Sequence, residues 1–507
     1  MKGKRDRSDS NAALDKKSKK EETTEPIEND DNSENEAIPD DLYEDEYDEE
    51  DLELLKRAEQ LNMEGGDEVD EDDSGKEEEA MVEDEEEEES SEKKVQFKEV
   101  YKGEAMEEGE VLDYDSSAYD MFHQLTMEWP CLSFDIFPDT LGENRGTYPH
   151  TVYFVGGTQA DHFTTNKLLI AKATQLHRTK YDDDPEYENE DDEDMDDEAE
   201  MDHRTLSHPG SVNRLKVMPQ APHYVSTWSE DGSVRIWDLS HFIDSLDNKS
   251  FGKTKTADHL VKVIKSHSEE GFALSWSPHT AGRLLSGDLK KFIYLTEMRE
   301  GGQFVESATP FSGHTKSVED LHWSPTEATV FSSCSSDKTI KIWDTRQNKQ
   351  PARSFFAADR DVNVISWNRS VPYLLASGDD AGIFKVWDLR SLKSGQSCES
   401  IGHYKWHKDQ ITSIEWDPND DSVIAVAGAD DQLTIWDLSV ERDTETETIK
   451  DGEAEYPPQL LFVHQGQKDI KELHWHKQIP DVIMSTAEDS LNIIRPNISE
   501  DIQQEDE

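Results

Sequence analysis

The stretch SVEDLHWSPTEATVFSSCSSDKTIKIWD, residues 317–344, carries the pattern that decides the fold. It ends on the alternating run TIKIWD, and an earlier tryptophan, Trp323, precedes Trp343 by about twenty residues. Between the two, Asp337 stands among serines, where a turn is expected. Apolar residues that alternate with polar ones predict short strands with one buried face. The stretch therefore predicts several short strands separated by tight turns.

These three features recur in register along the chain. The Trp-Asp pairs are Trp237-Asp238, Trp343-Asp344, Trp387-Asp388 and Trp436-Asp437. The second column of tryptophans holds Trp276, Trp323, Trp367, Trp416 and Trp475, with Val217 in the equivalent place of an earlier copy. The turn column holds Asp231, Asp288, Asp337, Asp380, Asp430 and Asp489. Copies about 44 to 59 residues apart begin near Val212, Phe272, Val318, Val362, Ile411 and Ile470.

Four short strands that end on Trp-Asp are typical of the WD-repeat blade. Because one blade cannot bury both of its faces, blades stack radially, and we predict an all-β, seven-bladed WD-repeat propeller. The tryptophan of each pair should fill the gap between blades, and the turn Asp should accept hydrogen bonds from the backbone and from a histidine such as His314. A degenerate seventh copy is expected from residues 131–137, 151–155 and 167–173. To close the ring, we expect Cys131–Phe137 to pair with strands near Ile483 and Ile493.

Charge is unevenly distributed along the 507 residues, whose formal net charge is -64. Such acidic stretches bury too little apolar surface to offset the entropy lost on folding. We therefore expect a basic tip at 1–20, a disordered acidic region at 21–112, a propeller at 113–498 with an acidic surface loop at 181–203, and an acidic tail at 499–507. A polyanion disfavours nucleic acid and anionic membranes as ligands and favours basic partners.

Cysteine usage and the N-terminal sequence favour the nucleus. Cys131, Cys334 and Cys398 give no disulfide framework in a chain of this length, which favours a reducing compartment. With no apolar leader and no long apolar run, we expect neither secretion nor membrane insertion. Basic clusters at residues 2–7 and 16–20 have the spacing of a bipartite import signal, although a solvated basic tip would have the same composition. We expect the nucleus and nucleolus, with some cytoplasmic shuttling.

Motifs for catalysis or cofactor binding are not found in the sequence. It has no P-loop, dinucleotide fingerprint or nucleophile elbow, so we predict neither an enzyme nor a cofactor. His474 and His476 alternate on one strand, but no nearby third ligand completes a metal site. Solvated or packing histidines are the better interpretation. The acidic run at 191–200 lacks the glycine of a calcium loop.

Acidic residues recur where blades present turns and strand starts to one rim. A ring of like charge focuses the field on cations. We predict an acidic mouth for a basic peptide on this top face, and solvated surface acids are the alternative interpretation. The predicted residues are Glu230, Glu319, Asp361, Asp379, Asp469 and Glu488.

Two further segments resemble a known family. Residues 116–139, SSAYDMFHQLTMEWPCLSFDIFPD, and residues 451–475, DGEAEYPPQLLFVHQGQKDIKELHW, are similar to the histone-binding WD-repeat proteins. The resemblance implies a short helix over residues 119–125, before Glu128-Trp129-Pro130, and a facing acidic loop that together hold a basic helix. The implied side groove contains Phe122, Leu125, Trp129, Asp451, Glu453, Glu455, Pro457 and Pro458.

A closer resemblance, over about residue 95 to the C-terminus, is to the glutamate-rich WD-repeat proteins. It is carried by CLSFDIFPDTLGENR, VYFVGGTQA and the acidic insert. It implies a dedicated chaperone of a basic large-subunit ribosomal protein, L-three, that supports ribosome biogenesis and associates with pre-ribosomes. A histone chaperone is the alternative, since both ligands are basic. WDTR at 343–346 and WDLR at 387–390 also resemble an adaptor-docking box of ubiquitin-ligase receptors, or each Arg simply stacks on the next blade.

Overall fold

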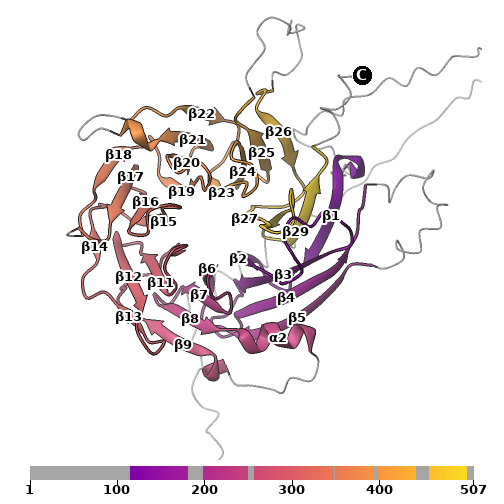
Figure 1. The fold of residues 1–507 in the computed structure, drawn as a ribbon, viewed down its shortest axis with the longest axis horizontal. Coiled ribbons are helices and arrows are strands. Elements are labelled where there is room, and N and C mark those ends of the chain that lie inside the picture. The colour runs from indigo at the N-terminus through magenta and orange to yellow at the C-terminus, as the bar shows by residue number, and fades with distance from the viewer. Residues whose placement is uncertain are drawn as a thin grey trace, which may run out of the picture. The chain divides into compact units, whose positions relative to one another are not determined.

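The described residues form a ring of seven antiparallel sheets (Figure 1). The computed structural model describes residues 115–180, 198–248, 256–347, 349–392, 398–440 and 456–498. The predicted seven-bladed propeller is confirmed. The expected basic tip, acidic region and acidic tail lie outside the described residues, apart from the margins of that region.

Each blade is a sheet whose first strand lies innermost. Blade 1 contains β2 (Cys131–Phe137), β3 (His150–Thr158), β4 (Lys167–Leu176) and β5 (Glu200–Ser207). Blade 2 contains β6 (Val212–Val217), β7 (Tyr224–Ser229), β8 (Val234–Asp238) and β9 (Leu260–Ile264). Blade 3 contains β10 (Ala273–Trp276), β11 (Arg283–Gly287), β12 (Phe292–Met298), β13 (Phe304–Glu306) and β14 (Phe311–Ser312).

The remaining blades repeat this order. Blade 4 contains β15 (Val318–Trp323), β16 (Val330–Ser335), β17 (Thr339–Asp344) and β18 (Arg353–Phe356). Blade 5 contains β19 (Val362–Trp367), β20 (Leu374–Asp379), β21 (Ile383–Asp388) and β22 (Gly402–Lys405). Blade 6 contains β23 (Ile411–Trp416), β24 (Val423–Gly428), β25 (Leu433–Asp437) and β26 (Leu460–His464). Blade 7 contains β27 (Glu472–Trp475), β28 (Ile483–Thr486), β29 (Ser490–Pro496) and β1 (Tyr119–Thr126).

The tryptophan of the Trp-Asp pair packs where two blades meet, as predicted. Trp343 of blade 4 is fully buried and packs against Phe311 of blade 3, with ring centroids 5.8 Å apart. It also stacks on Phe331 of its own blade, at 5.9 Å. Truncating a buried aromatic of this kind to alanine costs about 3–5 kcal/mol. The repeated tryptophans therefore join neighbouring blades into one structure.

The ring is closed by a different strand from the one expected. Cys131–Phe137 does not pair with the C-terminal strands but with β3 of blade 1. The closing strand is β1, which pairs antiparallel with β29, with Phe122 opposite Ile494 and Leu125 opposite Leu491. The short helix implied for residues 119–125 was therefore wrong, because these residues alternate buried and exposed side chains and complete blade 7. Only one 3-10 turn, η1 (Ser116–Ala118), precedes them among the described residues.

The acidic insert is shorter than predicted. Strand β5 begins at Glu200, inside the expected 181–203 loop, because Glu200–Asp202 pair with Ala173, Thr174 and Lys172 of β4. Helix α2 (Ser240–Asp247) lies beside β4 and β5 in Figure 1, and Arg204 donates to the Ser245 carbonyl at 2.7 Å. Two further 3-10 turns are η2 (Thr256–Asp258) and η3 (Leu389–Ser391). No helix of the described residues has the length and apolar character needed to cross a membrane.

Candidate functional site

The top face of the propeller consists of the loops that join successive blades and the turns between the second and third strands. In blades 2 to 7, the N–H of a turn residue donates to the carbonyl of a residue just before the inner strand, at 2.9 to 3.2 Å. These pairs are Glu230–Ser211, Leu289–Glu270, Ser336–Ser317, Asp380–Asp361, Ala429–Gln410 and Glu488–Lys468. The repeated bond places turn residues and strand-start residues side by side at one rim.

Hydrogen-bonded side chains fix the turns of this face. In blade 4, His314 Nδ1 lies 2.9 Å from Asp337 and its Nε2 lies 2.6 Å from the Ser333 hydroxyl, which also accepts from Trp343 Nε1 at 2.8 Å. Burial opposes ionisation of Asp337, but the bonds from His314 and Thr339 hold its pKa well below its usual range. This confirms the predicted link between turn Asp and blade His, and it makes the rim rigid.

Five of the six predicted rim acids reach the surface of this face. Glu230 and Glu488 lie exposed in turns, and Asp361 is half-buried before β19. Glu319 accepts from the hydroxyls of Ser317 and Ser336, and Asp469 forms an ion pair with Lys471. Among the described residues, no ion-pair partner is found for the carboxylates of Glu230, Asp361 and Glu488. These three are available to a basic ligand.

Asp379, the sixth predicted rim acid, does not belong to the mouth. It is 5% exposed, and its carboxylate accepts the N–H groups of Ala381 and Ile383 at 2.9 and 3.1 Å. The assignment of Asp380 to the buried turn column was also wrong, because Asp380 is exposed at the rim.

The reason is a substitution in blade 5. Aligned with blade 4 by its tryptophans, this blade has Ala358 in place of His314 and Ala381 in place of Asp337. Without the histidine–aspartate pair, the turn is held by Asp379 instead.

The side-groove residues lie in separate places. Phe122 packs with Leu461 and Phe462 of β26, whereas Leu125 belongs to a different apolar cluster. Trp129 is half-buried between β1 and β2. Pro457 and Pro458 line a pocket of about 350 Å³ together with His403, Tyr404, Lys405, Trp436 and Gln459. Asp451, Glu453 and Glu455 lie outside the described residues.

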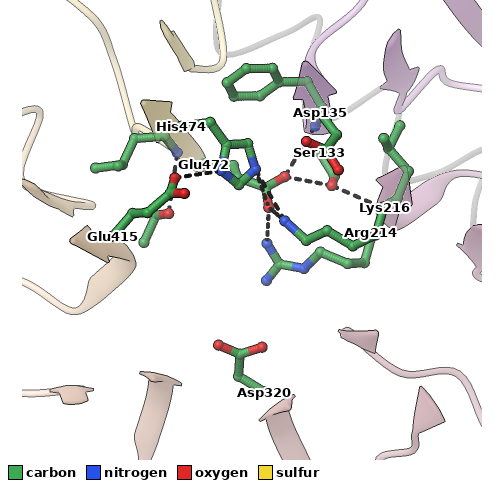
Figure 2. A network of polar contacts seen from close by, with 12 residues as sticks. Ser133, Asp135, Arg214, Lys216, Asp320, Glu415, Glu472 and His474 are labelled. Atoms are coloured by element: carbon green, nitrogen blue, oxygen red, sulfur yellow. Dashed lines mark hydrogen bonds and ion pairs between the residues drawn. The ribbon is translucent and has the colours of Figure 1, made fainter. Parts of the chain in front are cut away.

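A polar network that was not predicted from the sequence fills part of the central channel (Figure 2). At its centre, Glu472 of β27 has a side chain that is only 2% exposed. Its carboxylate accepts from Ser133 Oγ at 2.5 Å, from Phe134 N at 3.0 Å, from an Arg214 guanidinium nitrogen at 2.8 Å and from Lys216 Nζ at 2.7 Å. This one side chain therefore connects blade 7 with blades 1 and 2.

His474 extends this network to blade 6. Its Nδ1 lies 2.8 Å from Glu415, and its Nε2 lies 3.3 Å from Glu472. Burial and the charge of Lys216 oppose protonation, but the two carboxylates raise the pKa of His474 to about 9. Lys216 Nζ also approaches Nε2 at 3.0 Å, which would need a neutral ring to be a hydrogen bond. Two facing carboxylates outweigh that contact, so the ring is an imidazolium at neutral pH.

Other channel residues hold neighbouring inner strands together. Asp135 accepts from Val217 N at 2.8 Å, and Asp320 accepts from Ile365 N at 3.1 Å. Burial would raise the pKa of Glu472, yet the charges of Lys216 and Arg214 hold it well below its usual range. Among the described residues, no three His, Cys, Asp or Glu side chains are placed to hold a metal ion. The channel charges therefore neutralise one another, and their role is structural.

The arginines after two Trp-Asp pairs do not stack on the next blade. Arg346 and Arg390 each chelate the aspartate of their own pair, Asp344 or Asp388, at 2.7 to 3.2 Å. Their side chains are 68% and 63% exposed. Arg390 also covers the ring of Tyr373, 3.5 Å from its centroid, in the same blade.

Comparison with known proteins places both the fold and the N-terminal segment. Residues 109–177 match the family model that describes the histone-binding protein RBBP4 and its counterpart in the CAF1 complex. Residues 202–238, 305–344 and 398–437 match the WD domain, G-beta repeat.

Three relatives are similar over most of their length. Protein HEAT STRESS TOLERANT DWD 1 of Arabidopsis thaliana is 45% identical over 78% of this chain and 90% of its own length. Ribosome assembly protein rrb1 of Schizosaccharomyces pombe is 40% identical over 76% and 82%. Glutamate-rich WD repeat-containing protein 1 of Dictyostelium discoideum is 43% identical over 78% and 84%.

Proposed function

The chain belongs to the family of glutamate-rich WD repeat-containing and ribosome assembly proteins, and from this premise we propose that it supports ribosome biogenesis as a chaperone of a basic ribosomal protein. The resemblance to this family makes large-subunit protein L-three the first candidate. The proposal is one of binding and not of catalysis: the relatives include an assembly protein, and the WD-repeat propeller is a scaffold. Because its extensions carry many lysines and arginines, such a ligand needs its charge covered until rRNA replaces the chaperone.

The observation that carries the proposal is the set of exposed carboxylates on rigid turns of the top face. Glu230, Asp361, Asp380 and Glu488 stand at this rim, each held by a backbone bond or next to one. Acids that are already positioned lose less side-chain entropy on binding, and arginine can bridge a carboxylate through two hydrogen bonds. A basic extension laid across the rim would therefore meet preorganised anions.

Histone binding is a second candidate function with an observation of its own. The family model for histone-binding proteins matches residues 109–177. Against it, Phe122 and Leu125, implied in the side groove on a helix, lie on a β-strand and pack in different clusters. The top face therefore remains the stronger candidate surface.

A charge-reversal experiment tests the top face. Asp361→Lys with Asp380→Lys changes two adjacent acids whose residues are joined by a 3.0 Å backbone bond. Binding to recombinant ribosomal protein L-three, followed by surface plasmon resonance, should weaken at least about tenfold, or 1.4 kcal/mol. Glu300→Lys with Glu327→Lys, two exposed acids in turns on the opposite face, makes the same charge change and should bind normally.

Two outcomes would count against the proposal. If both double variants bind equally well, the top face is not the ligand site. If tagged protein isolated from translating cells carries histones in equimolar amount and no ribosomal protein, the histone-binding function replaces the proposed one.

We propose a nuclear and nucleolar location on the basis of the basic clusters at residues 2–7 and 16–20, which lie outside the described residues. Deleting residues 2–20 should leave a fluorescent fusion in the cytoplasm. Unchanged nuclear accumulation would show that the import signal is elsewhere.

A further inference from the structure

One aromatic side chain is exposed on the top face beside a rim acid. Phe163, in the loop between β3 and β4, is 46% exposed to solvent. Among the described residues no ring partner is found for it, although phenylalanine gains most from burial. It was not singled out from the sequence, because its loop lies in the degenerate blade without a Trp-Asp pair.

The backbone brings Phe163 next to Glu230 of the following blade. Gly210 N donates to the Phe163 carbonyl at 2.9 Å, and Glu230 N donates to the Ser211 carbonyl at 3.2 Å. The two consecutive residues Gly210 and Ser211 thus hold one loop on each side. Both partners are fixed by these bonds before any ligand arrives.

The side chains converge as well as the backbones. A Cβ atom built on Gly210 would lie 2.9 Å from Phe163 Cε2 and 2.9 Å from Glu230 Cγ. The φ of Gly210 is +78°, so glycine is favoured there on backbone grounds too. The ring edge and the carboxylate stem therefore border the same small space above Gly210.

The charges around this space leave Glu230 available. The nearest carboxylate in sequence, Asp231, is engaged by Arg235 at 2.5 Å. Asp161 and His162 are exposed in the loop of Phe163. No lysine or arginine of the described residues pairs with Glu230. An unpaired carboxylate beside an exposed ring attracts a cation through both its charge and the negative face of the ring.

We propose that Phe163 and Glu230 form a site for one lysine or arginine side chain of the basic partner. The inference rests on the proposed function and deepens it, because it assigns a specific cation site within a broadly acidic surface. The carboxylate binds the charged end, and the ring covers the stem or the flat face of a guanidinium.

A double-mutant cycle on the full chain tests the shared site. The probe is a fluorescein-labelled nona-arginine peptide, with the citrulline peptide as the uncharged control, in about 300 mM salt, where diffuse charge is strongly screened. Phe163→Leu keeps an apolar side chain but removes the ring, and should weaken binding about three- to fivefold. Glu230→Gln should weaken it about tenfold. The double variant should lose less than the product of the two, because each change disables the same site.

Matched controls are exposed residues away from the top face. Phe356→Leu, in the outer strand of blade 4 with 55% exposure, and Glu300→Gln should leave the affinity unchanged. If Phe163→Leu has no effect, or if the two losses multiply, the shared site is wrong. If Asp361→Lys with Asp380→Lys still weakens binding in that case, only the Phe163–Glu230 site is refuted. If that variant also binds normally, the proposed top-face function fails with it.

Discussion

Raising the pH from 6.5 to 8.5 should weaken the fold through one residue, His474. Its imidazolium lies between Glu415 and Glu472, at 2.8 and 3.3 Å, in the centre of the channel. When the proton leaves, the two carboxylates face each other with only Arg214 and Lys216 to neutralise them. The blades that this ring connects, 6 and 7, should lose free energy of association.

The magnitude follows from the shift in pKa. The pKa of His474 is about 9 in the folded chain against 6.5 when free. A raised histidine pKa contributes stability that is complete below 6.5 and is lost as the pH rises through 9. Linkage gives a loss of about 2 kcal/mol between pH 6.5 and 8.5.

Other shifted groups change stability outside this window. Burial lowers the pKa values of several histidines to about 3 or 4, so their contribution is lost below pH 6.5 and not above it; they are His150, His208, His322, His464 and His476. Burial raises the pKa of the Cys131 thiol to about 12, which affects stability mainly above pH 9. The decline between 6.5 and 8.5 therefore reports on His474.

Urea unfolding followed by tryptophan fluorescence measures this effect, since tryptophans of six blades are buried. His474→Gln should be about 3 kcal/mol less stable than the natural chain at pH 6.5 and much closer to it at pH 8.5. His403→Gln, at an exposed position of β22, should keep the natural pH dependence. Equal slopes for the natural chain and His474→Gln would refute the assignment of a buried imidazolium.

Three further changes test the channel, the blade and the acidic region. Glu472→Gln leaves three buried cations without their main carboxylate and should lower the free energy of unfolding by about 3–5 kcal/mol in the same assay, against less than about 0.5 for Glu300→Gln. Ser333→Ala removes the hydroxyl shared by His314 and Trp343 and should cost about 1–3 kcal/mol by urea unfolding. Deleting residues 21–92 should lower the association rate with the ribosomal protein and flatten its salt dependence, with little change in the dissociation rate measured by surface plasmon resonance.

Most of the fold could be predicted because its signal is local and repeated. The inner strands of blades 3 to 7 each end on a tryptophan, and the third strands of four blades end on Trp-Asp, so errors at one copy are corrected by the others. Closure of the ring has no such support. It depends on pairing Tyr119–Thr126 with a strand more than 360 residues later, roughly the longest separation the propeller allows, and nothing periodic marks that partner.

The candidate site was predictable only where the repeat is regular. Five rim acids could be placed because their turns follow the common pattern, whereas Asp379 was misplaced because blade 5 lacks the histidine and aspartate found in blade 4. The channel network could not be assembled at all. Ser133, Arg214 and Glu472 come from three blades, and only their convergence at the axis makes them partners. Charged residues at inner-strand positions were the one available signal.

Charge serves two distinct purposes in this propeller, and the partners of each carboxylate distinguish them. Glu472 is surrounded by donors from Ser133, Phe134, Arg214 and Lys216, so it has no capacity left for a ligand. Glu230, equally anionic, has a fixed backbone and no cation among the described residues. Like charges at one rim repel one another and cost stability, and the packed blades beneath must offset that cost. An arrangement that is unfavourable for folding but preorganised for cations is the expected trade between stability and binding. That trade is why the rim, and not the channel, is the surface to which we assign the basic ligand.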